Sequence, residues 1–230
     1  MEAARPTSRF RSGDPEPSGS SKAVTVDTKR LAAELRLRTR AEVRFDDGSR
    51  ALYATAASSY RQVPIGVVIP QDVDDIVETV AVARRHGAPV LVRGGGTSLA
   101  GQCCNVAVVI DTSRHVNRVL AIDPGSRRAR VQGGTVLDEL RGAAERYGLT
   151  FGPDPSTHNH CTLGGMIGNN SCGVHSMLAE FYGPGPRTSH SVEELEILTY
   201  DGTRMRVGPT PDAELDRIIR EGGRRGAIYA

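Results

Sequence analysis

The sequence of 230 residues can form one domain of ordinary size or two small ones, and its 29 Lys and Arg nearly balance its 27 Asp and Glu. Because the two signs are interspersed along the chain, we expect no nucleic-acid partner and no anionic membrane surface. No run of roughly 18 apolar residues occurs, so no transmembrane segment is predicted.

Residues 1–22 are rich in Ser, Pro, Gly and Arg and lack an apolar centre, which predicts a disordered tail and not a secretory signal. The four cysteines form no C-x-x-C pair, so neither a zinc site nor an iron–sulfur cluster is indicated: Cys103, Cys104, Cys161 and Cys172. Free thiols are the simplest interpretation. We therefore expect a cytoplasmic protein, with peripheral attachment to a membrane through a partner left open.

The first half of the chain alternates helix and strand signals. Asp27 is a candidate cap for a short helix, residues 50–64 are irregular, and residues 65–70 predict a buried strand. Asp72 is expected to cap the next helix, which ends at Gly87 and has these apolar residues at helical spacing: Val73, Ile76, Val77 and Val80. Further strands at 88–94 and 106–112 complete a βαβ unit, which implies parallel pairing.

The second half has an antiparallel pattern. A hairpin over 118–134 is predicted to turn at Asp123-Pro124-Gly125, and a second over 192–208 at Asp201-Gly202. Between them Thr135 is expected to cap a helix with an inward face of Leu137, Leu140, Ala144 and Tyr147. Residues 211–230 predict an amphipathic helix broken at Gly222-Gly223 and stop at the start of another element, so we expect a fragment. The fold class predicted is α+β, in two lobes.

Three consecutive glycines in "LVRGGGTSLAGQ" (91–102) follow the second parallel strand. Glycine allows a ligand to approach the backbone, and successive free N–H groups form a concavity that suits phosphate. A Walker loop would need Lys and Ser/Thr where the chain has Gln102 and Cys103, and a G-x-G-x-x-G fingerprint fails at Leu99. The stretch predicts a phosphate site of neither common kind.

A second glycine-rich stretch, "FGPDPSTHNHCTLGGMIGNNSCG" (151–173), has two interpretations. It is either a long structural loop whose asparagines cap a helix, or a second ligand loop. Two such stretches about 60 residues apart, each after a strand, favour the second interpretation.

These two stretches, together with "GPRTSHSVEELEILTYDG" (185–202), resemble flavoproteins of the vanillyl-alcohol oxidase and p-cresol methylhydroxylase type. The most similar branch comprises glycolate oxidase and the D-lactate and D-2-hydroxyglutarate dehydrogenases, and "SRALYATAASSYRQVPIGVVIP" (49–70) resembles longer members with an iron–sulfur domain. The resemblance implies an FAD-binding fold of two subdomains: a small parallel βαβ unit and a larger antiparallel sheet with helices. We expect a tail at 1–22, a helical or irregular segment at 23–64, subdomains at 65–112 and 113–210, and a truncated helical end at 211–230.

The resemblance also implies which residues bind FAD. In the first loop these are Gly94, Gly95, Gly96, Thr97, Ser98 and Gln102. In the second loop they are Pro155, Ser156, Thr157, Gly164, Gly165, Gly168 and Asn169, and Val192 matches the backbone that holds the adenine end. Thr97 stands where tethered members have a histidine, so non-covalent FAD is expected. Arg93 is expected to help neutralise phosphate, with a structural salt bridge as the alternative.

Two departures from the family pattern affect the function. "PGP" (184–186) lengthens the adenine-side loop, and the family's C-terminal cap domain, which holds the hydroxy-acid carboxylate and the catalytic base, is absent from these residues. His158 and His160 could be metal ligands, but without a nearby carboxylate a polar loop beside the flavin is the better interpretation. Cys161 could tether a flavin, although a small buried filler is more common.

Three functions remain open. The chain is the FAD-binding part of a dehydrogenase or oxidase that acts on a 2-hydroxy acid, with D-lactate, glycolate or D-2-hydroxyglutarate as the type of substrate and an iron–sulfur or other electron acceptor as a further partner. Alternatively, it is a non-catalytic flavin-binding subunit or relic. Thirdly, it is a nucleotide-binding protein of another kind, which lack of bound yellow colour would reveal.

Overall fold

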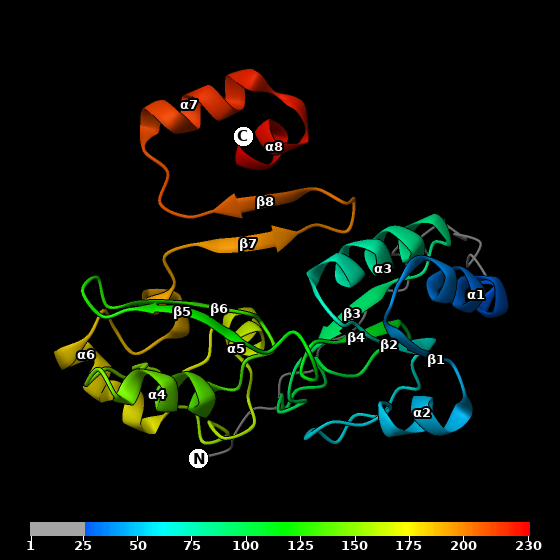
Figure 1. Ribbon diagram of the computed structural model, residues 1–230, viewed down its shortest axis with the longest axis horizontal. Helices are drawn as coiled ribbons and strands as arrows, with labels where there is room; N and C mark the ends of the chain where they lie inside the picture. Colours follow the sequence, from blue (N-terminus) through cyan, green and yellow to red (C-terminus); the bar gives the residue numbers. More distant parts are fainter. Residues whose placement is uncertain (1–25) are drawn as a thin grey trace, which may run out of the picture.

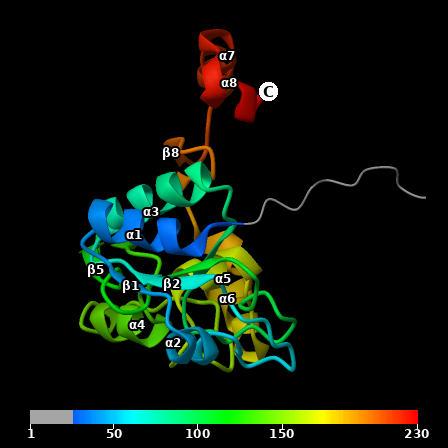
Figure 2. The ribbon, with the colours of Figure 1, turned by 90° about the vertical axis from the view of Figure 1, so that its right-hand side faces the viewer.

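The computed structural model describes residues 26–230, so the tail predicted at 1–22 lies outside the described residues. The described chain has three parts (Figure 1): a sheet of β1–β4 with α1, α2 and α3, a second group built on the β5–β6 hairpin with α4, α5 and α6, and the β7–β8 hairpin that leads to α7 and α8. Seen from the side, α7 and α8 lie beyond the end of that hairpin, away from both other groups (Figure 2).

The first group is built on a four-stranded sheet with the order β1-β2-β4-β3. The strands are β1 (Glu42–Arg44), β2 (Gly66–Ile69), β3 (Val90–Arg93) and β4 (Val108–Asp111). β2, β4 and β3 pair in parallel, as the βαβ pattern predicts, and Arg93 lies opposite Asp111 where β3 and β4 end. β1 adds an antiparallel edge that the sequence pattern does not indicate, because three residues are too short to show alternation.

Three helices cover this sheet, each capped by an aspartate: α1 (Thr28–Arg38) by Asp27, α2 (Asp47–Leu52) by Asp46 and α3 (Val73–Arg85) by Asp72. α1 and α3 lie over one face and α2 lies on the other (Figure 1). The core under α1 and α3 forms where the apolar faces of these helices pack on the sheet, and it includes Leu31, Leu35, Val68, Val82 and Val108. The prediction of an irregular chain from residue 50 is wrong at its start, since α2 continues to Leu52.

The second group packs helices against the β5–β6 hairpin. Its elements are β5 (Val119–Asp123), β6 (Arg128–Val131), α4 (Leu137–Glu145), α5 (Leu163–Asn169), the 3-10 helix η1 (Val174–Met177), α6 (Leu178–Tyr182) and the 3-10 helix η2 (Thr188–Ser191). The Asp123 carboxylate accepts hydrogen bonds from Gly125 and Ser126 N–H, which fixes the predicted turn. The core unites α4 with the second glycine stretch through Leu137, Leu140, Cys161, Leu163 and Met166.

Two expectations for α4 are wrong. Val136, not Thr135, is the N-cap residue, and the Glu139 carboxylate accepts a hydrogen bond from Val136 N–H. The Thr135 carbonyl is instead used by Leu163 N–H, so contact with the second glycine stretch overrides the local cap. Tyr147 lies after the helix end and is 42% exposed, because the chain turns away from the helical path at Gly148, whose φ is 66°.

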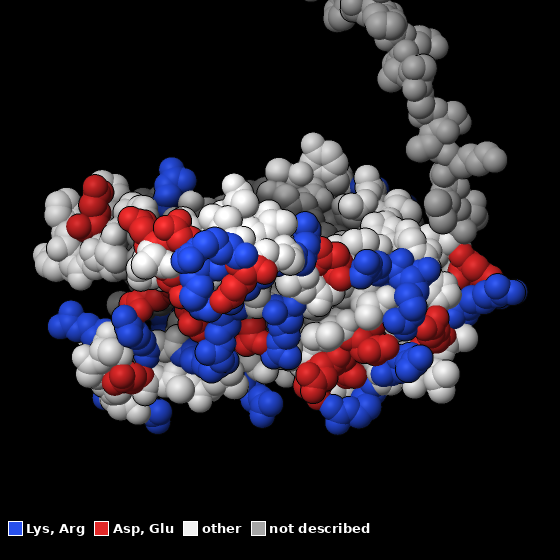
Figure 3. Space-filling model, turned by 90° about the horizontal axis from the view of Figure 1, so that it is seen from above, with Lys and Arg blue, Asp and Glu red and all other residues white. Residues whose placement is uncertain are grey.

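The third part ties the two groups together. β7 (Leu195–Leu198) and β8 (Arg204–Val207) form the predicted hairpin, and α7 (Asp212–Glu221) and α8 (Gly223–Tyr229) meet at the predicted break. At the hairpin tip the Tyr200 hydroxyl donates to the Ala88 carbonyl (2.9 Å) and the Arg84 guanidinium to the Asp201 carbonyl (2.6 Å). Lys and Arg alternate with Asp and Glu over the face seen from above (Figure 3), and the antiparallel strands are laced by ion pairs such as Arg128–Glu193 (2.6 Å).

We expect Tyr200→Phe to lower the free energy of unfolding by about 1 kcal/mol, because the Ala88 carbonyl loses its donor from the hairpin. Urea unfolding followed by circular dichroism measures the change. Tyr147→Phe is the matched control, since among the described residues the Tyr147 hydroxyl makes no hydrogen bond and the ring is similarly exposed (42% against 45%). Equal stability of the two variants would show that the hairpin tip does not anchor the fold.

Candidate functional site

The two glycine-rich stretches meet at a contact too close for side chains. A Cβ atom on Gly94 would collide with the Thr162 hydroxyl, and one on Gly95 would collide with the His160 carbonyl. The Asn169 side-chain amide also donates to the Ser98 hydroxyl across the two stretches (2.9 Å). Glycine at 94 and 95 is therefore required by protein packing, a reason that the sequence pattern alone did not reveal.

The backbone of residues 94–98 presents unused donors. Within the described chain, none of these five N–H groups donates a hydrogen bond to another residue, whereas the Gly96 carbonyl accepts from Ala57 N–H (3.0 Å). Gly96 has a φ of 66°, a left-handed conformation that glycine adopts without strain. A run of free N–H groups next to such a residue is a concavity that binds anions. The free N–H groups are thus in the arrangement that the sequence analysis expects of a phosphate site.

Arg93 supports this loop from behind. Its guanidinium donates to three backbone carbonyls: Tyr53 (3.2 Å), Cys103 (3.2 Å) and Thr55 (2.9 Å). In the part of the chain that the structure describes, no carboxylate lies within ion-pair distance, so the salt bridge considered as an alternative is not formed. A Cβ on Gly96 would lie 2.8 Å from Arg93 Nη2, so an uncompensated positive charge sits directly beside the loop. This charge favours a bound anion.

Tyr53 and Asp111 fix the strand ends from which this loop starts. The Tyr53 hydroxyl donates to Asp111 Oδ2 (2.5 Å), and Ser113 donates to Asp111 Oδ1 from its hydroxyl (2.7 Å) and its N–H (2.9 Å). Burial, and then the hydrogen bond to Asp111, raise the pKa of Tyr53 to about 12, so the phenol stays a donor. Sequence reasoning missed these residues, because Tyr53 and Asp111 are 58 positions apart and no local pattern links them.

α5 brings the second stretch to the same place. Its N-cap is Thr162, and Gly164 N–H donates to the Gly133 carbonyl (2.7 Å). The predicted residues Gly164, Gly165, Gly168 and Asn169 are all exposed, and a Cβ on Gly168 would meet nothing within 4 Å. The backbone of α5 at these positions is therefore accessible from outside the protein.

A third glycine pair, Gly133-Gly134, was not predicted as part of the site. Gly133 contacts Gly164, and a Cβ on Gly134 would collide with the Thr112 carbonyl. The adjacent Thr135 hydroxyl is buried and has no hydrogen-bond partner among the described residues. The letters "QGG" before a helix were the available signal. A buried Thr135 hydroxyl without a hydrogen-bond partner, next to glycine backbone with no side chains, is consistent with a bound cofactor that supplies the hydrogen bond.

The remaining predicted residues occupy different positions. Pro155 and Thr157 form a tight turn in which their carbonyls accept from His158 and Cys161 N–H, and Ser156 between them is exposed. Val192 ends η2, which is joined to the second stretch by Ser189 N–H donating to the Asn170 side chain (2.9 Å). Gln102 is exposed and its side-chain oxygen accepts from Ala100 N–H within its own loop; among the described residues it makes no hydrogen bond to the second stretch. Thr97 and Ser98 are half-buried in the first stretch, where the Ser98 hydroxyl accepts from the Asn169 amide.

The histidines and Cys161 have clear partners. His158 Nδ1 lies 2.7 Å from Asp138 Oδ2, so the expectation of no nearby carboxylate is wrong, because α4 supplies one from 20 positions away. His160 bonds Asn159, and the described residues contain no cluster of three possible metal ligands. Burial raises the pKa of the Cys161 thiol, which keeps it protonated and unreactive.

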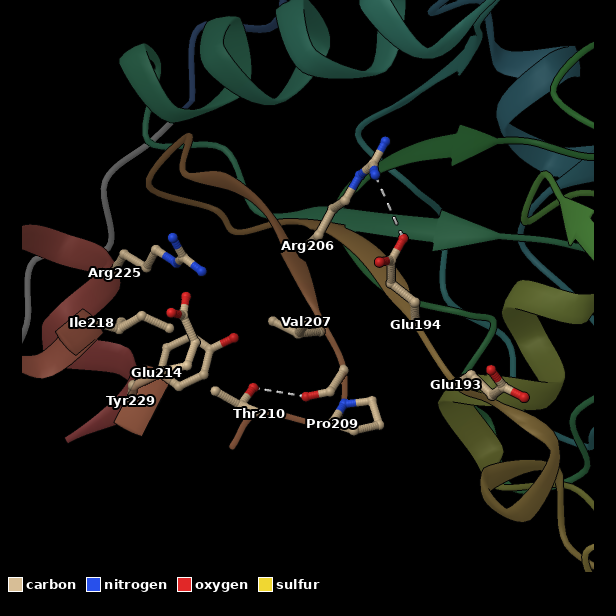
Figure 4. Close-up of a pocket in the computed structure, with 11 residues that line it drawn as sticks. Glu193, Glu194, Arg206, Val207, Pro209, Thr210, Glu214, Ile218, Arg225 and Tyr229 are labelled. Carbon is tan, nitrogen blue, oxygen red and sulfur yellow. Dashed lines mark hydrogen bonds and ion pairs between the residues drawn. The ribbon is translucent and has the colours of Figure 1, made fainter. Parts of the chain in front are cut away.

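A separate hollow of about 220 Å³ lies between β8 and the α7–α8 pair (Figure 4). Its lining includes both acidic and basic side chains, among them the Arg206–Glu194 ion pair (3.9 Å): Glu193, Glu194, Glu214, Arg206 and Arg225. None of its lining residues belongs to the glycine stretches, and its mixed charge selects no particular ligand. Within residues 26–230, no helix is both long and apolar enough to span a bilayer.

Comparisons with known proteins agree with this geometry. The family model described as "FAD binding domain" matches residues 64–208. The chain is 36% identical to the D-2-hydroxyglutarate dehydrogenase of Pseudomonas putida over 83% of this chain and 19% of that protein, and 34% identical to the glycolate oxidase subunit GlcD of Escherichia coli K12 over 66% and 29%. It thus spans about a fifth to a third of the length of these relatives.

Solved structures show the same fold at low identity. An alkyldihydroxyacetonephosphate synthase aligns with a TM-score of 0.68 and 22% identity over 81% of this chain and 36% of that one. The 6-hydroxy-D-nicotine oxidase of Arthrobacter nicotinovorans aligns with a TM-score of 0.63 and 24% identity over 75% and 36%. The predicted α+β fold and FAD as the cofactor are confirmed: the chain belongs to the family described as "FAD binding domain".

Proposed function

We propose that the chain is the FAD-holding part of an oxidoreductase that oxidises the CH–OH group of a 2-hydroxy acid. The observation on which this depends is the row of free N–H groups at residues 94–98, backed by the unpaired charge of Arg93. The names of the relatives, D-2-hydroxyglutarate dehydrogenase, glycolate oxidase subunit and D-lactate dehydrogenase, support the class of substrate.

The energetics of this loop suit the FAD diphosphate. That group has two negative charges, and each charge-assisted hydrogen bond from an N–H group contributes roughly 1.5–3 kcal/mol. Several backbone donors from Gly94 to Ser98 therefore anchor the cofactor without a lysine. Arg93 adds attraction but does not need to touch the phosphate, since its donors already bind three carbonyls.

The flavin then lies between the two stretches in this proposal. Gly164, Gly165, Gly168 and Asn169 line its second side with Pro155, Ser156 and Thr157, Gln102 closes the first loop, and the Val192 backbone meets the adenine end. The subdomains are residues 65–112 and 113–210. The orphaned Thr135 hydroxyl and Gly133 belong to the same wall.

The bound flavin supplies the acceptor for a hydride from the substrate carbon. Residues of this chain hold and orient the cofactor, while the substrate carboxylate and the hydroxyl proton are taken by groups outside these 230 residues. Two electrons per turnover must leave the reduced flavin, so an iron–sulfur or other electron-acceptor partner completes the reaction.

All four cysteines are free thiols, which supports a cytoplasmic location.

Gly168→Leu should separate cofactor binding from stability. The side chain would project from α5 into open space, so the free protein should keep or slightly gain stability, because leucine favours helix over glycine by roughly 0.5–1 kcal/mol. Affinity for FAD should fall by at least about tenfold if the flavin occupies that space. Gly142→Leu on α4 is the control, since a Cβ there also meets nothing within 4 Å. Equal FAD affinity of both variants would move the flavin away from α5.

FAD should be bound without a covalent link. Thr97 cannot form the bond that a histidine forms, and the buried Cys161 thiol is protonated. Acid precipitation of the yellow protein should release all colour into the supernatant. Colour that stays with the pellet would contradict this expectation and would identify Cys161 or a histidine as the attachment point.

The 230-residue chain should bind FAD but should not turn over D-2-hydroxy acids by itself. Positioning of a substrate against the flavin supplies roughly 7–11 kcal/mol of barrier reduction. Beside the flavin loops, the described residues provide no set of side chains that would hold the carboxylate of the substrate. Dye reduction with D-lactate, glycolate and D-2-hydroxyglutarate measures turnover, with and without the remainder of a related enzyme. Rapid turnover by the chain alone would place the catalytic groups here, and no turnover even with that remainder would favour a non-catalytic flavin-binding subunit.

A further inference from the structure

Arg141 of α4 binds the segment that leads into the Pro155–Thr157 turn. Its Nη1 donates to Asp154 Oδ1 (2.6 Å), while Nε and Nη2 donate to the Phe151 carbonyl (3.3 and 3.1 Å) and Nη2 to the Pro153 carbonyl (3.2 Å). The Arg141 side chain is 23% exposed. One guanidinium fork thus binds three of the four residues that precede the turn.

Asp154 is held from the other side by the turn before η1. Its N–H donates to the buried Ser176 hydroxyl (2.7 Å), and a Cβ on Gly173 would collide with its carbonyl oxygen. Although burial alone would raise the pKa of Asp154, the hydrogen bonds from Arg141 and His175 outweigh it and hold this pKa below its usual value. The carboxylate is therefore charged at neutral pH, so the Arg141 ion pair persists.

The contacts of the three side chains contribute unequally. Arg141 and Asp154 are mostly buried, with 23% and 19% of their side chains exposed, whereas His175 is 80% exposed and contacts Asp154 only through Nδ1 (3.0 Å). Exposed ion pairs contribute little because water screens them. The order of importance is then Arg141, Asp154, His175.

We propose that Arg141 and Asp154 are positioning residues for FAD: they fix the backbone of residues 151–154 and thereby the Pro155–Thr157 turn against which the flavin is held. The inference rests on the proposed function, which places FAD at that turn. Unlike Arg93, Arg141 has a carboxylate partner, Asp154, that neutralises its charge. Arg141 therefore does not attract the negative charge of the cofactor. Its contribution is geometric.

The test compares Arg141→Gln, Arg141→Lys and Asp154→Asn in the full 230-residue chain. We expect the dissociation constant for FAD to rise about tenfold or more in both Arg141 variants, because an ammonium cannot replace a fork that meets three acceptors. At saturating FAD, the visible circular dichroism of the bound flavin should move toward that of free FAD, a signal that weaker binding alone does not alter. Arg146→Gln, an exposed position one turn further along at the helix end, is the matched control and should match the unaltered chain.

Far-ultraviolet circular dichroism verifies that each variant is folded, and Asp154→Asn replaces Arg141→Gln if the latter does not fold. The Arg141→Gln/Asp154→Asn double variant should bind FAD no more weakly than the worse single variant, because both residues act through one segment. Unchanged affinity and unchanged flavin dichroism in the Arg141 variants, or additive losses in the double variant, would overturn the inference. A His175→Gln loss as large as that of Arg141→Gln would do so too. Failure of the unaltered chain to bind FAD would instead contradict the proposed function.

Discussion

The close approach of residues 94–95 to residues 160–162 is the constraint on which the site depends. At that contact Gly94 packs against the Thr162 hydroxyl and Gly95 against the His160 carbonyl, and a methyl group on either glycine would force the two groups of secondary structure to shift. The same contact brings the free N–H groups of 94–98 and the exposed glycines of α5 into one neighbourhood, where the Asn169 amide of α5 donates to the Ser98 hydroxyl. The glycines at 94 and 95 thus serve the contact between the two stretches, and the proposed FAD site uses the backbone N–H groups beside it.

Two arginines keep these loops in shape by binding backbone carbonyls. Arg93 joins the first loop to Tyr53 and Thr55, which lie 40 and 38 positions away, and Arg141 joins α4 to residues 151–154. They differ in charge balance. Arg141 is neutralised by Asp154, whereas Arg93 has no carboxylate partner in the described chain. Arg141 therefore only fixes the shape of its loop, whereas Arg93 fixes the shape of its loop and its charge also favours a bound anion. A loop that is already held in its binding conformation loses less entropy when a ligand binds.

The sequence pattern predicted the features that depend on neighbouring residues, namely helices, turns and helix breaks. The apolar spacing after Asp72, the turns at Asp123 and Asp201 and the break at Gly222 all appear in the structure, because caps, turns and amphipathic faces depend on neighbouring residues. The two glycine-rich stretches singled out in the sequence meet in the structure, and their contact with FAD stays a prediction. What was missed depends on distant partners: β1 pairs with a strand more than 20 positions away, Thr135 gives its carbonyl to Leu163 and loses its cap role, and His158 finds Asp138 on another element. Such contacts leave no periodic signal in a single sequence.

Backbone amide NMR of the labelled chain tests most directly whether residues 94–98 bind the diphosphate. Spectra are recorded with FAD and with riboflavin, which has the same ring system but no phosphate. The account predicts that FAD shifts the amide resonances of Gly94 to Ser98 and slows their exchange with water, while riboflavin leaves them nearly unchanged. Equal shifts with both ligands, or no shift at these five amides on addition of FAD, would contradict it.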